Sequence, residues 1–399
     1  MKNRVAQRMS TLSPSLTLAI SAKAKAMQQA GESVVSFGVG EPDFNTPEHI
    51  IEAAKAALDA GHTKYTPSSG LLPLRKAICE KFQKDNGLEY EPSQIIVSNG
   101  AKHSIFNACY AILDEGDEVI IPEPYWLTYP EVVKVCGAVP KYLTCKKENK
   151  YKFSAEELKA AITPKTKMLI FNSPSNPTGA VYNEEEVRAI AKVCEEAEIF
   201  VLADEIYEKL CYNGVKPFSI AKVSEKMKDL TITVNGVSKT YAMTGWRVGY
   251  LAAPKDIAKA IDSFQSHATS NACSISQYAT IEALKAPEAE IQAMVEVFDK
   301  RRAKLLGLIA EIDGVQAVEP DGAFYVMLVV GGLYGKSYQG KALTNSIEFA
   351  DALLDAEKVA TVPGVSFGAD DCLRLSYSLS EEDIETGLAR IKKFVSELQ

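Results

Sequence analysis

The sequence predicts an α/β protein with a large, doubly wound, mostly parallel sheet domain and a smaller α+β domain. Short apolar runs alternate with amphipathic helical segments. The runs are continuous, as expected for strands covered by helices on both faces. The 399 residues are 46% hydrophobic and 24% charged, so the chain is long enough to build a full core. After about residue 285 a long charged helical segment and shorter apolar runs follow. We predict a large domain at 47–285, and a small domain formed by 1–46 together with 286–399.

End signals mark the helices. In TPEHIIEAAKAALDAG, Thr46 occupies a predicted N-cap position, Pro47 the first helical position and Gly61 the position just past the end. Two further helices open with capping-box pairs, which are Ser154 with Glu157 and Asn183 with Glu186. The predicted strands of the large domain are QIIVS, EVII, KMLIFN, IFVLAD and TITVN. The small domain is expected to contain the helical segment PEAEIQAMVEVFDKRRAKLLGLIAEI, the strand AFYVMLVV, a helix near 345–356, the strand RLSYS and a final helix.

Composition excludes several kinds of partner. The formal net charge is −8 without a basic cluster, which argues against nucleic acid or an acidic membrane. No segment approaches the ~18 to 20 apolar residues of a membrane helix. Eight scattered cysteines without a CxxC pair indicate reduced thiols, and four dispersed histidines give no metal site. We therefore expect a cytoplasmic protein without a metal.

A dinucleotide site is also disfavoured. The GxG stretch SFGVGEPDF lacks the third glycine and does not lead directly into a helix. No GxxxxGK[ST] phosphate loop is present. The doubly wound sheet is therefore expected to bind another kind of ligand.

Informative side chains follow five of the predicted strands. Ligands of such sheets bind beyond the carboxyl ends of the strands. The residues placed there are the turn Gly100, Ala101 and Lys102, then Trp126, Asn176, Asp204 with Tyr207, and Lys239. Each has an ordinary structural explanation on its own, such as a core indole, a helix cap or a solvated amine. Together they suit one ligand, a phosphorylated, protonatable aromatic ring that carries an aldehyde.

Longer motifs carry a family resemblance. SNPTG, ADEIY and SKTYAMTGWRVGY occur in this order, and GVGEPDFNTPEHI, TKYTPSSGLLPLR and LRLSYS accompany them. The chain, from about Ser13 to its end, resembles the fold-type I aminotransferases of class I that depend on pyridoxal 5'-phosphate, most closely the bacterial aspartate aminotransferases. The resemblance implies that cofactor, an amino acid and a 2-oxo acid as substrates, and a homodimer with shared active sites.

The resemblance also implies roles around the cofactor ring. Lys239 would bind the cofactor aldehyde covalently and then move a proton. Asp204 would hold a proton on the ring nitrogen. Tyr207 would bond to the ring oxygen beside Asn176, and Trp126 would stack on the ring.

The phosphate would be held by a second set of groups. Arg247 would form a two-pronged contact, helped by the backbone N–H groups of Gly100, Ala101 and Lys102. Tyr65 would reach the phosphate of the neighbouring subunit. One departure is Gly236, because many relatives have a serine three positions before the lysine.

The substrate contacts follow in the same way. Arg374 would grip the α-carboxylate, with Gly40, Trp126 and Asn176 nearby, so that the Cα–H bond stands perpendicular to the ring. Lys102 and Thr17 match the residues that bind the second carboxylate of an acidic substrate.

The expected reaction is transfer of an amino group from L-aspartate to 2-oxoglutarate. The alternatives are a class I aminotransferase with aromatic, alanine or prephenate specificity, and a cofactor-binding transcription regulator. The regulators carry an N-terminal DNA-binding domain, and here the core is expected to begin almost at once.

Overall fold

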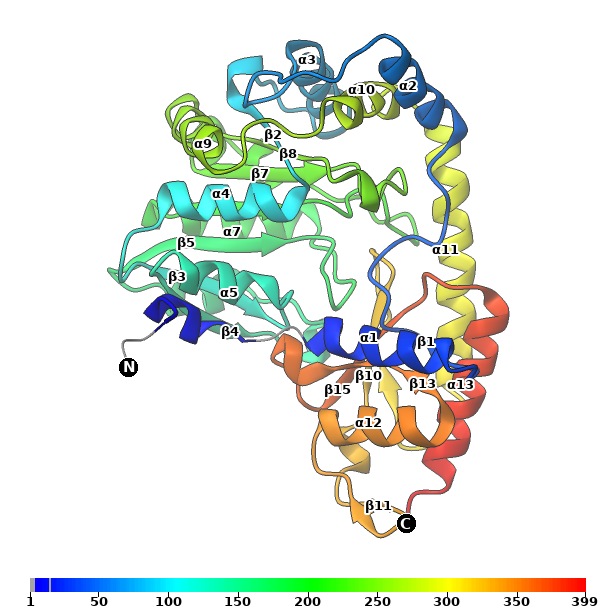
Figure 1. Ribbon diagram of the computed structural model, residues 1–399. Helices are drawn as coiled ribbons and strands as arrows, with labels where there is room; N and C mark the ends of the chain where they lie inside the picture. Colours follow the sequence, from blue (N-terminus) through cyan, green and yellow to red (C-terminus); the bar gives the residue numbers. More distant parts are fainter. Residues whose placement is uncertain (1–3, 14–15) are drawn as a thin grey trace.

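The centre of the molecule is a seven-stranded sheet with the strand order β2-β8-β7-β6-β5-β3-β4. The computed structural model describes residues 4–13 and 16–399 (Figure 1). Only β8 runs against the common direction of the other strands, so the predicted doubly wound, mostly parallel sheet is confirmed. The strands are β2 (Ile95–Ser98), β3 (Glu118–Glu123), β4 (Val139–Thr144), β5 (Thr166–Asn172), β6 (Phe200–Asp204), β7 (Thr231–Gly236) and β8 (Gly249–Ala252).

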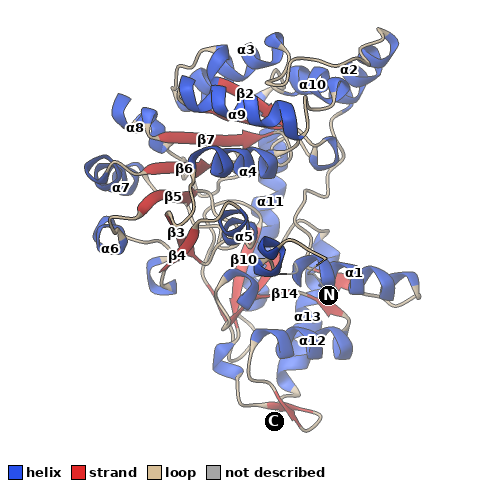
Figure 2. Cartoon of the chain, turned by 60° about the vertical axis from the view of Figure 1, so that its left-hand side comes forward, coloured by secondary structure: helices blue, strands red, loops and turns tan. Residues whose placement is uncertain are grey.

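Helices cover both faces of this sheet, which explains the continuous apolar runs. Ile170 and Leu202 pack toward α4 (Ala101–Ile112), α5 (Thr128–Val135) and α9 (Lys255–Ala268). Leu169 and Val201 point to the other face, toward α6 (Ala155–Ala161) and α7 (Glu184–Ala197). Figure 2 shows α4 and α5 on one side of the strands and α6 and α7 on the other. Successive strand residues therefore point to opposite faces, and both faces are buried.

Local helix signals were accurate with one exception. The predicted capping boxes at Ser154 and Asn183 are present. In α2 (Glu48–Asp59), however, the N-cap is Pro47, so the predicted cap at Thr46 is wrong by one residue. The Thr46 hydroxyl instead donates to the Ala242 carbonyl at 2.8 Å. A long-range partner therefore replaces the local capping contact.

A second, smaller sheet lies beside the first. Its antiparallel order is β14-β15-β10-β9. The long helix α11 (Glu288–Ile309) runs down the right-hand side of Figure 1, from the level of the large sheet to that of the small one. The predicted helix near 345–356 is α12 (Ser346–Glu357). The predicted domain boundary at residue 285 remains a prediction.

The remaining strands and helices have the following residue ranges. The strands are β1 (Val35–Ser36), β9 (Gln316–Ala317), β10 (Tyr325–Val329), β11 (Ser337–Tyr338), β12 (Lys341–Ala342), β13 (Val359–Ala360), β14 (Val362–Pro363) and β15 (Cys372–Ser376). The helices are α1 (Leu16–Gln29), α3 (Leu72–Lys81), α8 (Glu225–Asp229), α10 (Ser274–Ala283) and α13 (Glu381–Ser396).

A buried ionic cluster lies close to the end of β6. Lys81 bonds to Glu208, and Lys209 lies 3.0 Å from Asp85. Glu205, the residue after the strand, is only 7% exposed and meets the amide of Asn86 at 3.4 Å. Asp85 and Glu208 thus pair with the two lysines, and Glu205 forms no ion pair among the described residues. Burial, with the nearby Glu208 charge, raises the pKa of Glu205 to about 8, so this carboxyl is mostly protonated at neutral pH.

The Glu205 proton should make stability fall with rising pH. The folded chain keeps this proton up to about pH 8, whereas the unfolded chain releases it near the ordinary value of 4.5. The contribution of this proton to the free energy of unfolding is complete below pH 4.5, the pKa of Glu205 in the unfolded chain. It is lost as the pH rises to about 8, the pKa of Glu205 in the folded chain. Glu205→Gln has no proton to lose, so we expect its stability to improve relative to wild type by ~1 kcal/mol or more between pH 5 and 8.

Urea unfolding at fixed protein concentration measures this difference. Glu208→Gln serves as the matched control, since it should be destabilised across this range by leaving Lys81 without its bonded carboxylate. Parallel pH profiles for wild type and Glu205→Gln would rule out a buried proton at Glu205.

Candidate active site

The strand ends bring the predicted residues to one edge of the large sheet. Asn172 on β5 pairs in register with Asp204 on β6, which pairs with Val234 on β7. The Asn172 amide donates to the Asp204 carbonyl at 2.9 Å, and its oxygen accepts the Asn176 N–H at 2.8 Å. The parallel register therefore sets the Asn172 amide beside the Asp204 carboxylate, and Lys239 follows the end of the next strand, β7.

Asp204 is a buried carboxylate with two hydrogen bonds. Tyr129 donates its hydroxyl to Oδ2 at 2.7 Å, and the Ile206 N–H donates to Oδ1 at 3.3 Å. Burial raises the pKa of Asp204 to about 6, while these hydrogen bonds and Lys239 oppose the rise. The group is therefore still ionised at neutral pH, and it can hold a proton on a basic partner.

Lys239 is an amine in a cation-rich setting. Its Nζ donates to the Gly40 carbonyl at 2.5 Å and lies 5.8 Å from the centre of the Tyr207 ring. Burial lowers the pKa of Lys239 to about 8, against the pull of Glu41, and the charges of Arg374 and Arg247 add to the lowering. A substantial neutral fraction is therefore available as a nucleophile or base near pH 7 to 8.

The N-terminus of α4 forms an anion cradle. Gly100 caps the helix with a φ of 89°, a conformation that suits glycine. A methyl group there would collide with the Arg247 guanidinium, and one on Gly249 would collide with the Ala101 backbone N–H. The glycines thus let an arginine and free helix N–H groups approach one point.

Arg374 on β15 is 3% exposed, yet its partners carry no formal charge. It donates to the Asn176 side-chain oxygen at 3.2 Å and to the Gly38 carbonyl at 3.1 Å. Its Nε has no hydrogen-bond partner among the described residues. The Tyr325 ring lies 4.4 Å from the guanidinium carbon. A buried guanidinium with an unused donor suits a carboxylate ligand.

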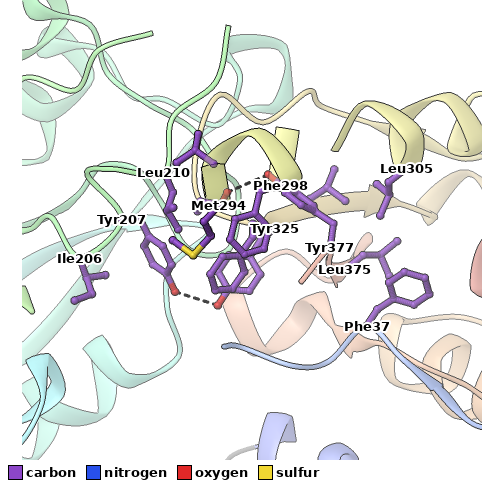
Figure 3. Close-up of a cluster of buried hydrophobic side chains, with 14 of the residues drawn as sticks. Phe37, Ile206, Tyr207, Leu210, Met294, Phe298, Leu305, Tyr325, Leu375 and Tyr377 are labelled. Carbon is purple, nitrogen blue, oxygen red and sulfur yellow. Dashed lines mark hydrogen bonds between the residues drawn. The ribbon is translucent and has the colours of Figure 1, made fainter. Parts of the chain in front are cut away.

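Two tyrosines connect the sheets beside Arg374. The hydroxyls of Tyr207 and Tyr325 lie 3.0 Å apart (Figure 3). Tyr207 comes from the loop after β6 and Tyr325 from β10 of the small sheet. The contact therefore joins the Lys239 edge of the large sheet to the strand that pairs with Arg374.

Four cations of the site form no ion pair with the described residues, so the site suits an anionic ligand. Arg374 and Lys239 bond as described, and Arg247 donates to the carbonyls of Thr244 and Asn99. The Lys102 amine lies 4.8 Å from the Trp126 ring centre, and burial lowers its pKa, with Arg247 adding to this effect. Arg374 is buried, where an unpaired charge is costly, so it favours a carboxylate ligand, whereas Arg247 and Lys102 are exposed and open to a phosphate or carboxylate. The donor set thus fits pyridoxal phosphate, with an amine for its aldehyde, a carboxylate for its nitrogen and a cradle for its phosphate.

The surroundings of four further residues named from the sequence differ from one another. Tyr65 is 90% exposed, and its contact with a neighbouring subunit stays a prediction. Gly40 supplies the carbonyl that Lys239 meets. Thr17 lies in α1, but its side chain falls outside the described residues. A methyl group on Gly236 would meet Gly249 and Val248 at 3.1 Å, so little room exists there for a serine.

Sequence reasoning missed Tyr129, Tyr325 and Gly38. A buried tyrosine hydroxyl usually has a hydrogen-bond partner, so the sequence could have suggested that each tyrosine forms such a bond. The sequence around each tyrosine does not indicate which residue that partner is. Within residues 4–13 and 16–399, no helix has the length and apolar character needed to cross a membrane. The same residues contain no cluster of three or more His, Cys, Asp or Glu suited to a metal ion.

Comparisons with known proteins agree over nearly the whole chain. Residues 32–391 match the family described as aminotransferase class I and II. An aspartate aminotransferase of Bacillus subtilis is 50% identical over 98% of this chain and 99% of its own. A probable aspartate/prephenate aminotransferase of Aquifex aeolicus is 46% identical over 100% of both. The crystal structure of the aspartate aminotransferase from Rhizobium meliloti superposes with a TM-score of 0.96 at 42% identity, covering 99% of this chain and 100% of that one.

The cradle can be tested with Gly100→Ala. Its methyl group would displace the Arg247 guanidinium, so we expect binding of pyridoxal phosphate to weaken roughly tenfold or more. Gly116→Ala is the matched control, because Gly116 has a φ of 88° and open space around it. Both variants carry similar backbone strain. Equal cofactor dissociation constants in the two variants would argue against a cradle at Gly100.

Proposed function

The chain belongs to the class I and II aminotransferases, a family of pyridoxal-phosphate-dependent transferases, and from that premise we propose that it transfers the amino group of L-aspartate to 2-oxoglutarate. The products would be oxaloacetate and L-glutamate, released in two half-reactions. The observation that carries the proposal is Arg374, a buried guanidinium with an unused donor and no acidic partner in the described chain. Such a group suits the α-carboxylate of an amino acid.

Pyridoxal phosphate, when bound, supplies an aldehyde for amines and a ring that withdraws electrons from the substrate Cα. In this proposal Lys239 would hold the cofactor until the substrate amine takes its place, and the freed Nζ would then accept and return the Cα proton. Its lowered pKa suits this task near neutral pH. Asp204 keeps the ring nitrogen protonated. Tyr207 and Asn176 bind the ring oxygen, and Trp126 covers the ring face.

Other residues bind and orient. Arg247 and the N–H groups of Gly100, Ala101 and Lys102 hold the phosphate, joined by Tyr65 from a second subunit of a homodimer. Arg374 fixes the substrate so that the Cα–H bond stands perpendicular to the ring. Gly40, Trp126 and Asn176 contribute further substrate contacts. The proposal includes a cytoplasmic location, amino acids and 2-oxo acids as substrates, and neither nucleic acid nor a membrane as a partner.

The second carboxylate of an acidic substrate needs its own cation. We assign this role to Lys102, with Thr17 as a hydroxyl partner. A broader specificity that includes prephenate is the alternative, since the name of the Aquifex aeolicus relative includes it. Relative rates with aspartate, aromatic amino acids and prephenate would separate the two.

The covalent link to Lys239 gives a direct test. Borohydride treatment of the cofactor-loaded protein should attach the cofactor irreversibly to the peptide that contains Lys239. Lys102→Ala should retain this label, whereas Lys239→Ala should bind cofactor without it. Lys239→Ala should also slow turnover by a factor on the order of 10² or more, because the proton acceptor is lost. Peptide mapping that finds the label on another lysine would contradict the assignment.

Specificity is tested by Lys102→Ala. Removing the cation should raise KM for aspartate and glutamate roughly tenfold or more and leave neutral amino acids much less affected. Lys102→Arg keeps the charge and should retain part of the acidic preference. Steady-state kinetics of Lys102→Ala with acidic and with neutral amino acids measure this difference. An equal loss of kcat/KM for both classes would assign Lys102 to phosphate binding or to the fold.

A further inference from the structure

The hydrogen bonds of Asp204 point to a residue that the sequence motifs did not include. Tyr129 is 2% exposed and Asp204 is 3% exposed, so water does not compete for their contact. The hydroxyl-to-carboxylate distance of 2.7 Å is that of a strong O–H···O bond. The only other donor to this carboxylate in the described chain is the Ile206 N–H, at a longer 3.3 Å.

Tyr129 also touches the neighbouring Trp126. It lies in the first turn of α5, where its N–H donates to the Trp126 carbonyl at 2.9 Å. The two rings meet edge to face, with centroids 5.4 Å apart and planes at 86°. This contact and the helix backbone hold the phenol in one orientation. The hydroxyl is therefore preorganised toward Asp204.

The direction of the hydrogen bond is fixed by the charges present. Burial raises the pKa of Tyr129 well above its usual value, and the Asp204 charge adds to the rise, so the phenol keeps its proton and donates it. The other titratable groups near Asp204 are Lys239, Tyr207 and Glu205. Lys239 favours the carboxylate by charge alone. Without the Tyr129 donor, burial would shift Asp204 toward its neutral acid.

We propose that Tyr129 is a positioning residue that holds the Asp204 side chain in place and keeps it as a carboxylate able to retain a proton on the cofactor ring nitrogen. This inference rests on the proposed function, since it needs the cofactor at this site. Tyr129 acts only through Asp204 and Trp126. No hydrogen bond joins it to the phosphate cradle or to Arg374 among the described residues.

Tyr129→Phe tests the inference because it removes one oxygen from the site. The holoenzyme would be prepared with pyridoxal phosphate labelled with nitrogen-15, and the ring nitrogen signal would be followed against pH. We expect the nitrogen of the variant to lose its proton at a pH about one unit lower than in wild type. The kcat should fall while KM for the amino acid stays within about twofold, because substrate contacts are unchanged.

Tyr151→Phe is the matched control. Tyr151 lines the same small cavity as Tyr129, but its hydroxyl meets Cys372 Sγ at 3.6 Å. Its nitrogen titration should coincide with that of wild type. A shift of equal size in both variants would make the effect one of packing and would overturn the proposal.

A second substitution covers the case in which Tyr129→Phe does not fold. 3-Fluorotyrosine at position 129 is nearly isosteric and is a more acidic donor, so the ring nitrogen should keep its proton to higher pH. An unmoved titration in either Tyr129 variant contradicts the role proposed here. A wild-type protein that binds no pyridoxal phosphate would instead contradict the proposed function itself.

Discussion

The site is organised by four cationic side chains that form no ion pair with the described residues. Lys102, Lys239, Arg247 and Arg374 converge on one region, and their near partners are carbonyls, an amide and aromatic rings. Elsewhere, buried cations have carboxylates, as Lys81 has Glu208. Of the four, Arg374 is buried, whereas Lys102 and Arg247 are exposed. Burying an unpaired charge is unfavourable, so the cost at Arg374 is offset when an anion binds. Phosphate and substrate carboxylates would supply that charge.

The fold determines how these charges meet. Parallel strands end at one edge of the large sheet, so β5, β6 and β7 deliver Asn172, Asp204 and, after the strand, Lys239 to one place. The antiparallel small sheet adds Arg374, which is paired with Met327 on β10. Glycines at 100 and 249 then remove the side-chain atoms that would keep Arg247 and the α4 N-terminus apart. The candidate active site therefore lies where the large sheet, the small sheet and the N-terminus of α4 meet.

Sequence patterns predicted what depends on neighbours along the chain. Capping boxes, apolar strands and motif residues such as Asp204 are local signals, and the strand ends follow from the topology. The missed contacts join residues far apart in sequence: Tyr129 and Asp204 are 75 positions apart, and Arg374 and Gly38 are 336 apart. The one wrong cap has the same cause, because Thr46 bonds to Ala242, 196 positions away. Such pairings are set by tertiary packing, which no local pattern encodes.

The most direct test of the four unpaired cations is calorimetric binding of a four-carbon dicarboxylate that has no amino group to transfer. Titrated into the cofactor-loaded protein, it should bind with one molecule per subunit, and its affinity should weaken with salt. A matched monocarboxylate should bind roughly tenfold or more weakly, and a neutral diamide should not bind measurably. Equal affinity for the dicarboxylate and the neutral diamide would contradict the account, because the cations would then not be held for anionic ligands.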